Sequence, residues 1–137
     1  MTKELWLNLP VKNLGKSIEF FKRIGFSFHE NSPGNTSTSA PMYIGTKKVV
    51  VMLFEEAPFK ASAGNEVADT SKGSEVLLSF DAESREEVDE IAKNVVAAGG
   101  TLFAQPTEVQ GWMYGCGFVD PDGHRWNALY MDMSKMK

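Results

Sequence analysis

Three residues of this chain have side chains that could bind or transform a ligand. Glu75 could act as a general base or hold a cationic group of a ligand. Trp6 could stack against a planar or cationic ligand, and Asn127 could form hydrogen bonds to one. Each has a simpler interpretation as well: a solvated carboxylate at a rim, a filler of a closed cavity, or a partner for a neighbouring strand. The residue types alone leave these alternatives open.

The two histidines and the single cysteine give catalysis little support. By alternation from Asn127, His124 falls on the opposite face of a strand, which favours a structural role. We expect His29 to be exposed. The thiol of Cys116 could point into a pocket, but neither histidine has a predictable relation to it, so Cys–His catalysis is unsupported. A buried free cysteine is the default interpretation.

The first half of the chain predicts one helix among several strands. Residues 5–9 alternate between apolar and other residues as a strand does, and we expect Pro10 to end that strand. Asn13 is a suitable N-cap for the following helix, which we expect to stop at Gly25. Further strands are predicted at 26–28, 42–44 and 48–54, with a turn or mobile loop at 31–39.

The second half predicts the same order again. Residues 75–80 alternate as a strand, and Ser84 to Glu87 fits a capping box at the start of a helix. That helix is expected to stop at Gly99–Gly100. Three more strands are predicted at 101–104, 113–119 and 125–131, the last two joined by a turn with the sequence Asp-Pro-Asp-Gly.

The repeated β-α-β-β-β order, at an offset of roughly 70 residues, predicts an α+β fold of two modules. A module that cannot bury its own face must pair with its twin, so we expect the two to form one curved mixed sheet. Residues 1–137 would be a single domain, with module one at about 1–56, a linker at about 57–72 and module two at about 73–137. Leucine and valine positions should face the helices. The opposite, concave face should carry Trp6, Asn8, Met52, Glu75 and Asn127.

Composition excludes several classes of function. Hydrophobic residues make up 42% of the chain and charged residues 23%, which is typical of an ordered globular protein. A net charge of −4 argues against nucleic acid as a partner. No apolar run approaches the roughly 20 residues of a membrane helix, so no membrane partner is expected. A single cysteine and the lack of a signal peptide predict a cytoplasmic protein.

Two motifs resemble the vicinal oxygen chelate superfamily. They are Asn8-Leu9-Pro10-Val11-Lys12-Asn13-Leu14 before a helix, and Met113-Tyr114-Gly115 followed by Phe118-Val119-Asp120-Pro121-Asp122-Gly123-His124. The superfamily includes glyoxalase I, extradiol dioxygenases, fosfomycin-resistance enzymes and bleomycin-resistance proteins. The resemblance covers essentially the whole chain and is greatest to glyoxalase-like proteins with an MYG–DPDGH signature. It implies a cup formed by two βαβββ modules.

The resemblance also locates the positions that bind metal in other members. Four ligands come from the first and last strands of each module, and the matching residues here are Trp6, Met52, Glu75 and Asn127. A divalent ion needs three or more His, Asp or Glu donors, and only Glu75 is one. The resemblance therefore implies no metal cofactor. Glyoxalase and extradiol chemistry, which the metal performs on two neighbouring oxygens of the substrate, would not carry over.

We therefore expect a metal-independent homodimer that binds a small organic molecule in the concave cup, as bleomycin-resistance proteins sequester theirs. The expected lining residues are Trp6, Asn8, Met52, Phe54, Glu75, Leu77, Met113 and Asn127. One alternative is a metal-dependent lyase or isomerase of the glyoxalase I (lactoylglutathione lyase) type, with Glu75 as its catalytic residue. Another is a filled cavity and a role in partner contact.

Overall fold

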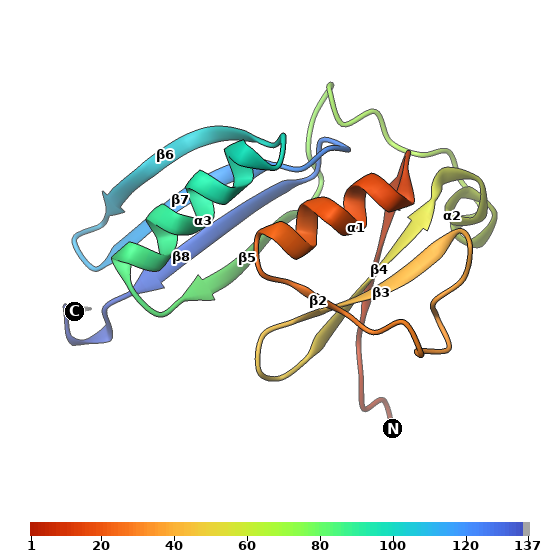
Figure 1. Cartoon of the computed structure of the whole chain (residues 1–137), viewed down its shortest axis with the longest axis horizontal. Coiled ribbons are helices and arrows are strands. Elements are labelled where there is room, and N and C mark those ends of the chain that lie inside the picture. Colours follow the sequence, from red (N-terminus) through yellow and green to blue (C-terminus); the bar gives the residue numbers. More distant parts are fainter. Residues whose placement is uncertain (136–137) are drawn as a thin grey trace. The chain divides into compact units, whose positions relative to one another are not determined.

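The computed structural model describes residues 1–135, and the chain forms two compact units that divide between Asp69 and Thr70. The first unit contains β1 (Leu7–Val11), α1 (Leu14–Arg23), β2 (Ser27–Phe28), β3 (Ser39–Ile44), β4 (Val49–Glu55) and α2 (Glu56–Ala63). The second contains β5 (Leu77–Ala82), α3 (Arg85–Ala97), β6 (Thr101–Val109), β7 (Met113–Val119), β8 (Arg125–Met131) and the short 3-10 helix η1 (Met133–Lys135). Figure 1 labels the helices and strands of each unit.

Each unit has its own four-stranded mixed sheet, and the two sheets share one topology. The strand orders are β1-β4-β3-β2 and β5-β8-β7-β6. In both, the first strand of the unit runs parallel to the last, while the remaining pairs are antiparallel. This pairing places Asn8 opposite Met52 in the first sheet and Ser79 opposite Asn127 in the second. The predicted α+β class and the repeated βαβββ order are confirmed.

The long helix of each unit begins and ends through local chemistry that the sequence predicts. The Asn13 and Ser84 side chains each accept a hydrogen bond from the amide three residues on, at 3.1 and 3.0 Å. Gly25 and Gly99 follow the helices with φ of +109° and +94°, the left-handed conformation that glycine adopts most easily. No helix among residues 1–135 is long and apolar enough to cross a membrane.

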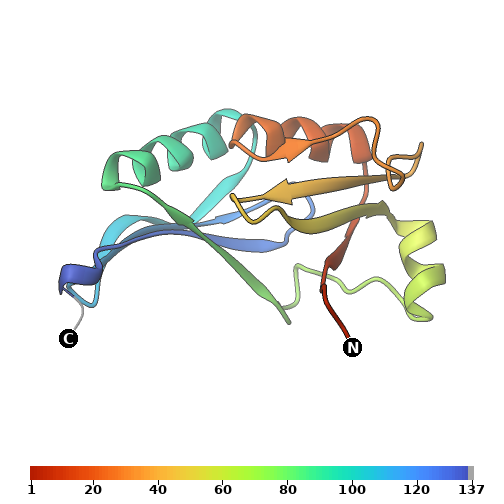
Figure 2. The ribbon, with the colours of Figure 1, turned by 90° about the horizontal axis from the view of Figure 1, so that it is seen from below.

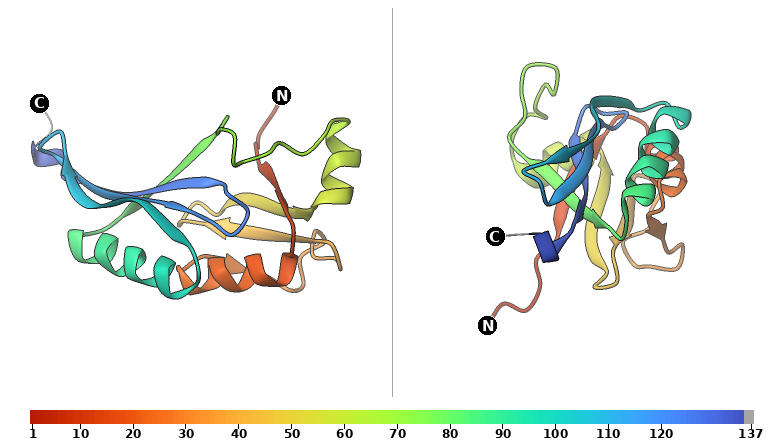
Figure 3. Two further views of the ribbon diagram at one scale, coloured as in Figure 1. Left: turned by 90° about the horizontal axis from the view of Figure 1, so that it is seen from above. Right: turned by 90° about the vertical axis from the view of Figure 1, so that its left-hand side faces the viewer.

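The core of each unit lies between its long helix and one face of its sheet. Figure 2 shows α1 lying along the first sheet, and Figure 3 shows α3 along the second. In the first unit this interface contains Leu9, Val11, Leu14, Phe20, Phe21, Ile24, Met42, Val51 and Leu53, all buried. In the second unit the Phe118 and Trp126 rings stack with centroids 6.2 Å apart. Leu9 and Val11 of β1, and Val51 and Leu53 of β4, therefore face the helix, as predicted. Val50 does not follow this prediction, because it alternates with Val51 and lies on the opposite face.

The predicted limits of the first strand in each unit are wrong. The first strand begins at Leu7, so Trp6 precedes it, and the strand continues through Pro10 to Val11. Pro10 is tolerated because β1 is an edge strand, where a residue without an amide hydrogen costs least. Strand β5 begins only at Leu77, which leaves Glu75 at a bend before the strand.

The predicted linker contains a helix that the apolar pattern does not show. Helix α2 ends at Gly64, whose φ of +66° is left-handed. All of its residues are at least partly exposed, so it has no apolar stripe for a periodicity argument to find. Strand β6 is also longer than the predicted 101–104, because it continues to Val109. Two shifts of register allow it to stay paired with β7 over this length.

Candidate functional site

A pocket of about 570 Å³ lies on the first unit, over the outer face of its sheet, which we define as the face opposite α1. Alternate residues of β4 project from this face. The pocket is lined by Lys3, Glu4, Leu5, Trp6, Lys47, Lys48, Val49, Val50, Met52 and Phe54. Three of the predicted ligand-binding residues, Trp6, Met52 and Phe54, are therefore brought together. Asn8 is exposed on β1 beside Met52 and does not belong to that lining.

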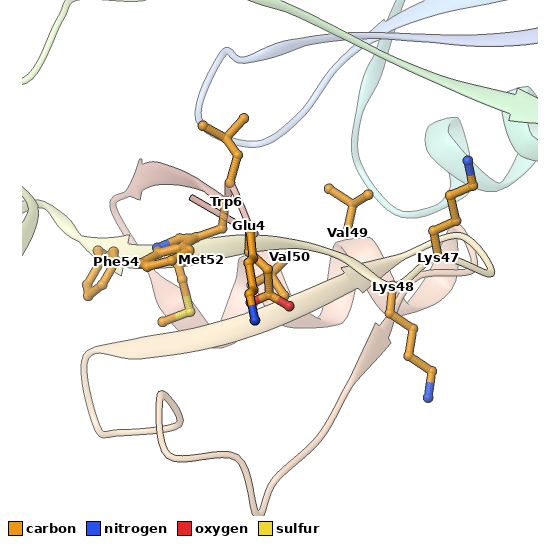
Figure 4. Close-up of a pocket in the computed structure, with 10 residues that line it drawn as sticks. Glu4, Trp6, Lys47, Lys48, Val49, Val50, Met52 and Phe54 are labelled. Atoms are coloured by element: carbon orange, nitrogen blue, oxygen red, sulfur yellow. The ribbon is translucent and has the colours of Figure 1, made fainter. Parts of the chain in front are cut away.

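One end of the pocket has apolar and aromatic walls. Figure 4 shows the indole of Trp6 lying over Met52 and beside Phe54. Met52 and Phe54 are half-buried on β4, and Trp6 comes from the segment before β1. The Trp6 side chain is 55% exposed, so it does not fill a closed cavity. A planar group could lie against this wall.

The other end of the pocket carries positive charge. Lys47 and Lys48 come from the turn between β3 and β4. A third lysine of the lining, Lys3, comes from the segment before β1, as Trp6 does. Lys48 has a φ of +52°, which tightens that turn. The apolar pattern does not point to these lysines. Lys47 falls between the strands predicted at 42–44 and 48–54, and Lys48 is the first residue of the second.

The loop between β2 and β3 supports the apolar end. A Cβ added at Gly34 would lie 2.9 Å from the terminal methyl of Met52, so the loop backbone approaches that side chain closely. The hydroxyl of Ser39 donates a 2.7 Å hydrogen bond to the Gly34 carbonyl and holds the loop in place. The 31–39 segment predicted as a turn or loop therefore packs against a residue of the pocket.

The predicted site residues of the second unit are more scattered. Leu77 is 53% exposed at the start of β5, while Met113 and Asn127 are half-buried on β7 and β8. The β5–β8 pairing places Ser79, not Glu75, opposite Asn127. Glu75 is exposed and lies before this pairing begins. The alternation that placed Glu75 on the same face as Asn127 assumed a strand that starts at residue 75, two residues before β5 begins.

A second aromatic surface lies beside Asn127 and was not predicted. Gly117 is the β7 partner of Asn127, and the ring of Phe103 packs on it where a Cβ would otherwise stand. The Arg125 guanidinium lies 4.8 Å from the centre of that ring, within cation–π distance.

His124 and Cys116 lie in structural surroundings. The backbone amide of His124 donates a 3.0 Å hydrogen bond to the carboxylate of Asp120 in the turn before β8. Cys116 is buried opposite Ala128, and burial raises the pKa of its thiol. A thiol with a raised pKa is a poor nucleophile. His29 is exposed, as predicted, and stacks edge-on against Tyr43.

The four residues that the resemblance places at metal-binding positions, Trp6, Met52, Glu75 and Asn127, do not fit a divalent ion. An indole has no lone pair to donate, a thioether is a poor ligand for hard cations, and a carboxamide offers only a neutral oxygen. Glu75 is the single anionic donor of the set. Among residues 1–135, no three His, Cys, Asp or Glu side chains are grouped so that they could hold a metal ion.

Comparison with known proteins gives a consistent family. Residues 5–128 match the model of the Glyoxalase/Bleomycin resistance protein/Dioxygenase superfamily. The structure of hypothetical protein SA1046 from S. aureus is 34% identical over 95% of each chain, with a TM-score of 0.84. A glyoxalase/bleomycin resistance protein/dioxygenase family enzyme from Burkholderia phytofirmans PsJN is 21% identical over 92% of this chain and 96% of that one, with a TM-score of 0.74. The fosfomycin resistance protein FosX from Listeria monocytogenes is 18% identical over 98% of each chain, with a TM-score of 0.66. No curated protein matches the chain.

Proposed function

Because the chain belongs to the Glyoxalase/Bleomycin resistance protein/Dioxygenase superfamily, we propose that it binds a small organic molecule on the outer face of its first sheet without a metal ion. The observation that supports this most directly is the pocket walled by Trp6, Met52 and Phe54. Its volume of about 570 Å³ falls in the range of small-molecule sites. Its apolar walls would bind a planar group, as such sites usually do.

The chemistry of the side chains supports binding over metal-assisted catalysis. Glyoxalase-type reactions need a cation that polarises two oxygens of the substrate. An indole, a thioether, one carboxylate and a carboxamide make a poor donor set for such a cation. Glu75, the residue predicted as a base, is exposed at a bend outside the pocket lining.

The binding protein would act as a cytoplasmic homodimer. Large apolar side chains remain exposed in the second unit, among them Val76, Leu77 and Met131, and a second copy of the chain would cover such groups. A single buried cysteine suits a reducing compartment. Light scattering after size exclusion should give twice the chain mass of 15.1 kDa, and a monomer at micromolar concentration would refute the dimer.

Binding can be tested with a library of planar aromatic fragments, using thermal shift and then calorimetry. Fragments that bind should lose about tenfold in affinity in Trp6→Ala, because a stacking wall contributes up to about 1.5 kcal/mol. Trp112→Ala, which removes a half-buried tryptophan of the second unit, is the matched control and should bind normally. A library without hits, or hits insensitive to Trp6→Ala, would refute the proposed site.

Metal independence needs a separate measurement. Elemental analysis of the purified protein should show no stoichiometric metal, and fragment affinities should not change after chelation. About one tightly held Ni, Zn, Mn or Fe per chain would overturn this part of the proposal.

A further inference from the structure

We infer that the ligand of the pocket on the first unit is an organic anion: a flat apolar body against Trp6, with a carboxylate, sulfonate or phosphate group toward the lysines. The inference rests on the proposed function, since it names the chemical class of the ligand for the same site. It follows from the distribution of charge along the pocket.

The pocket is basic although the chain is acidic. The whole chain has 14 basic and 18 acidic residues, for a net charge of −4. The pocket lining contains three lysines, Lys3, Lys47 and Lys48, against one carboxylate, Glu4, which gives the lining a formal charge of 3 − 1 = +2. This local reversal of sign would attract an anion and oppose a cation.

None of the pocket lysines forms an ion pair with a carboxylate of residues 1–135. The ion pairs of residues 1–135 are Lys60–Glu66, Arg85–Glu108 and Lys135–Asp132, so none of them uses a lysine of the pocket. All three pocket lysines are exposed. Their long side chains can therefore turn toward a ligand without first giving up a partner in the protein.

Charge and apolar surface are separated along the pocket. Figure 4 shows Trp6, Met52 and Phe54 toward one end, and Lys47 and Lys48 at the other, where their side chains extend to opposite sides of the turn. A ligand that uses both ends needs an apolar body and an anionic group at one end of it. A neutral planar molecule would use only the walls, and a cationic one would meet the lysines unfavourably.

Three isosteric probes test this charge preference by calorimetry: 2-naphthoate, 2-naphthamide and 2-naphthylmethylammonium. We expect the anion to bind about tenfold more tightly than the amide at low ionic strength, and the cation to bind most weakly. The preference should shrink in high salt, because the lysines are exposed. In Lys47→Gln/Lys48→Gln, 2-naphthoate should fall to the affinity of the amide, whose own binding should stay unchanged.

The matched control is Lys16→Gln/Lys22→Gln, which removes the same charge from exposed positions of α1 on the other face of the sheet. An equal loss of 2-naphthoate binding in that variant would overturn the inference. Equal binding of all three probes, still weakened by Trp6→Ala, would overturn it and leave the proposed function standing. If none of the probes binds, this inference fails, while the proposed function is judged by the fragment library.

Discussion

The carboxylate of Asp120 accepts a 3.0 Å hydrogen bond from the indole nitrogen of Trp126 within the second unit. Its other oxygen accepts bonds from the amides of Asp122 and His124, at 2.9 and 3.0 Å. Asp120 is only 5% exposed. One buried carboxyl group therefore joins the turn before β8 to the aromatic core beneath α3.

Replacing this carboxyl group should destabilise the protein. In Asp120→Asn one oxygen becomes an NH₂ donor, which must face either the indole N–H or the two amides, so at least one bond is lost. We expect the free energy of unfolding to fall by about 1–2 kcal/mol in urea titrations at neutral pH. Asp81→Asn, on the exposed face of β5, is the control and should change stability by less than about 0.5 kcal/mol.

The same residue should make stability depend on pH. Burial raises the pKa of Asp120 above its ordinary value of 3.8, although the charge of His124 and the hydrogen bond from Trp126 partly oppose this. The folded state therefore holds the proton more tightly than the unfolded chain. The pH-dependent part of the stabilisation from Asp120 is present in full below pH 3.8 and is lost as the pH rises through the folded pKa. The hydrogen-bond contribution expected at neutral pH remains. The stability difference between wild type and Asp120→Asn should shrink as the pH is raised. A difference that grows with pH would contradict this.

Two glycines of β7 should differ in their tolerance of alanine. At Gly117 an added Cβ meets the ring of Phe103, which is 43% exposed and can swing outward, so we expect a cost of about 1 kcal/mol. At Gly115 the Cβ would lie 2.8 Å from the backbone carbonyl oxygen of Ala128, which cannot move without disturbing the sheet. We expect Gly115→Ala to cost about 3 kcal/mol in urea titrations. Equal costs would show that Phe103 is held as firmly as the backbone.

The thiol of Cys116 should react slowly in the folded protein. It is buried, and burial raises its pKa, so both access and the thiolate fraction are reduced. Because the chain has one cysteine, a thiol reagent such as DTNB reports on this residue alone. We expect labelling at least about 100-fold slower than in urea-unfolded protein, since it requires local opening. Comparable rates would place the thiol at the surface.

The parts of the fold that depend on neighbouring residues were predictable. Asn13 and Ser84 begin helices because their side chains bond to amides three residues away, and Gly25 ends one because it adopts a left-handed φ. The turn before β8 closes with a bond from the Gly123 amide to the Asp120 carbonyl, as its proline and glycine predict. These interactions lie within a few residues of one another, so the sequence shows them directly.

The rest depends on contacts between distant segments. Helix α2 has no apolar stripe, and the start of β5 depends on its pairing with β8. The pocket brings Trp6, from the segment before β1, next to Met52 of β4. It also includes Lys47 and Lys48 of the turn, which no apolar periodicity in the sequence points to. Alternation correctly placed Met52 and Phe54 on the face away from the helix. The alternation could not show that Glu75 precedes β5 and its pairing with β8.

The parallel pairing of the first and last strands in each unit has a consequence for how such proteins diverge. Asn8 is paired with Met52 across neighbouring strands, and Ser79 is paired with Asn127 in the same way. The members of each pair lie more than 40 residues apart in the chain. Two codon changes are therefore enough to install a new pair of adjacent side chains, with the buried face left untouched. Functional side chains at these paired positions can therefore be lost or replaced with little effect on the stability of the fold.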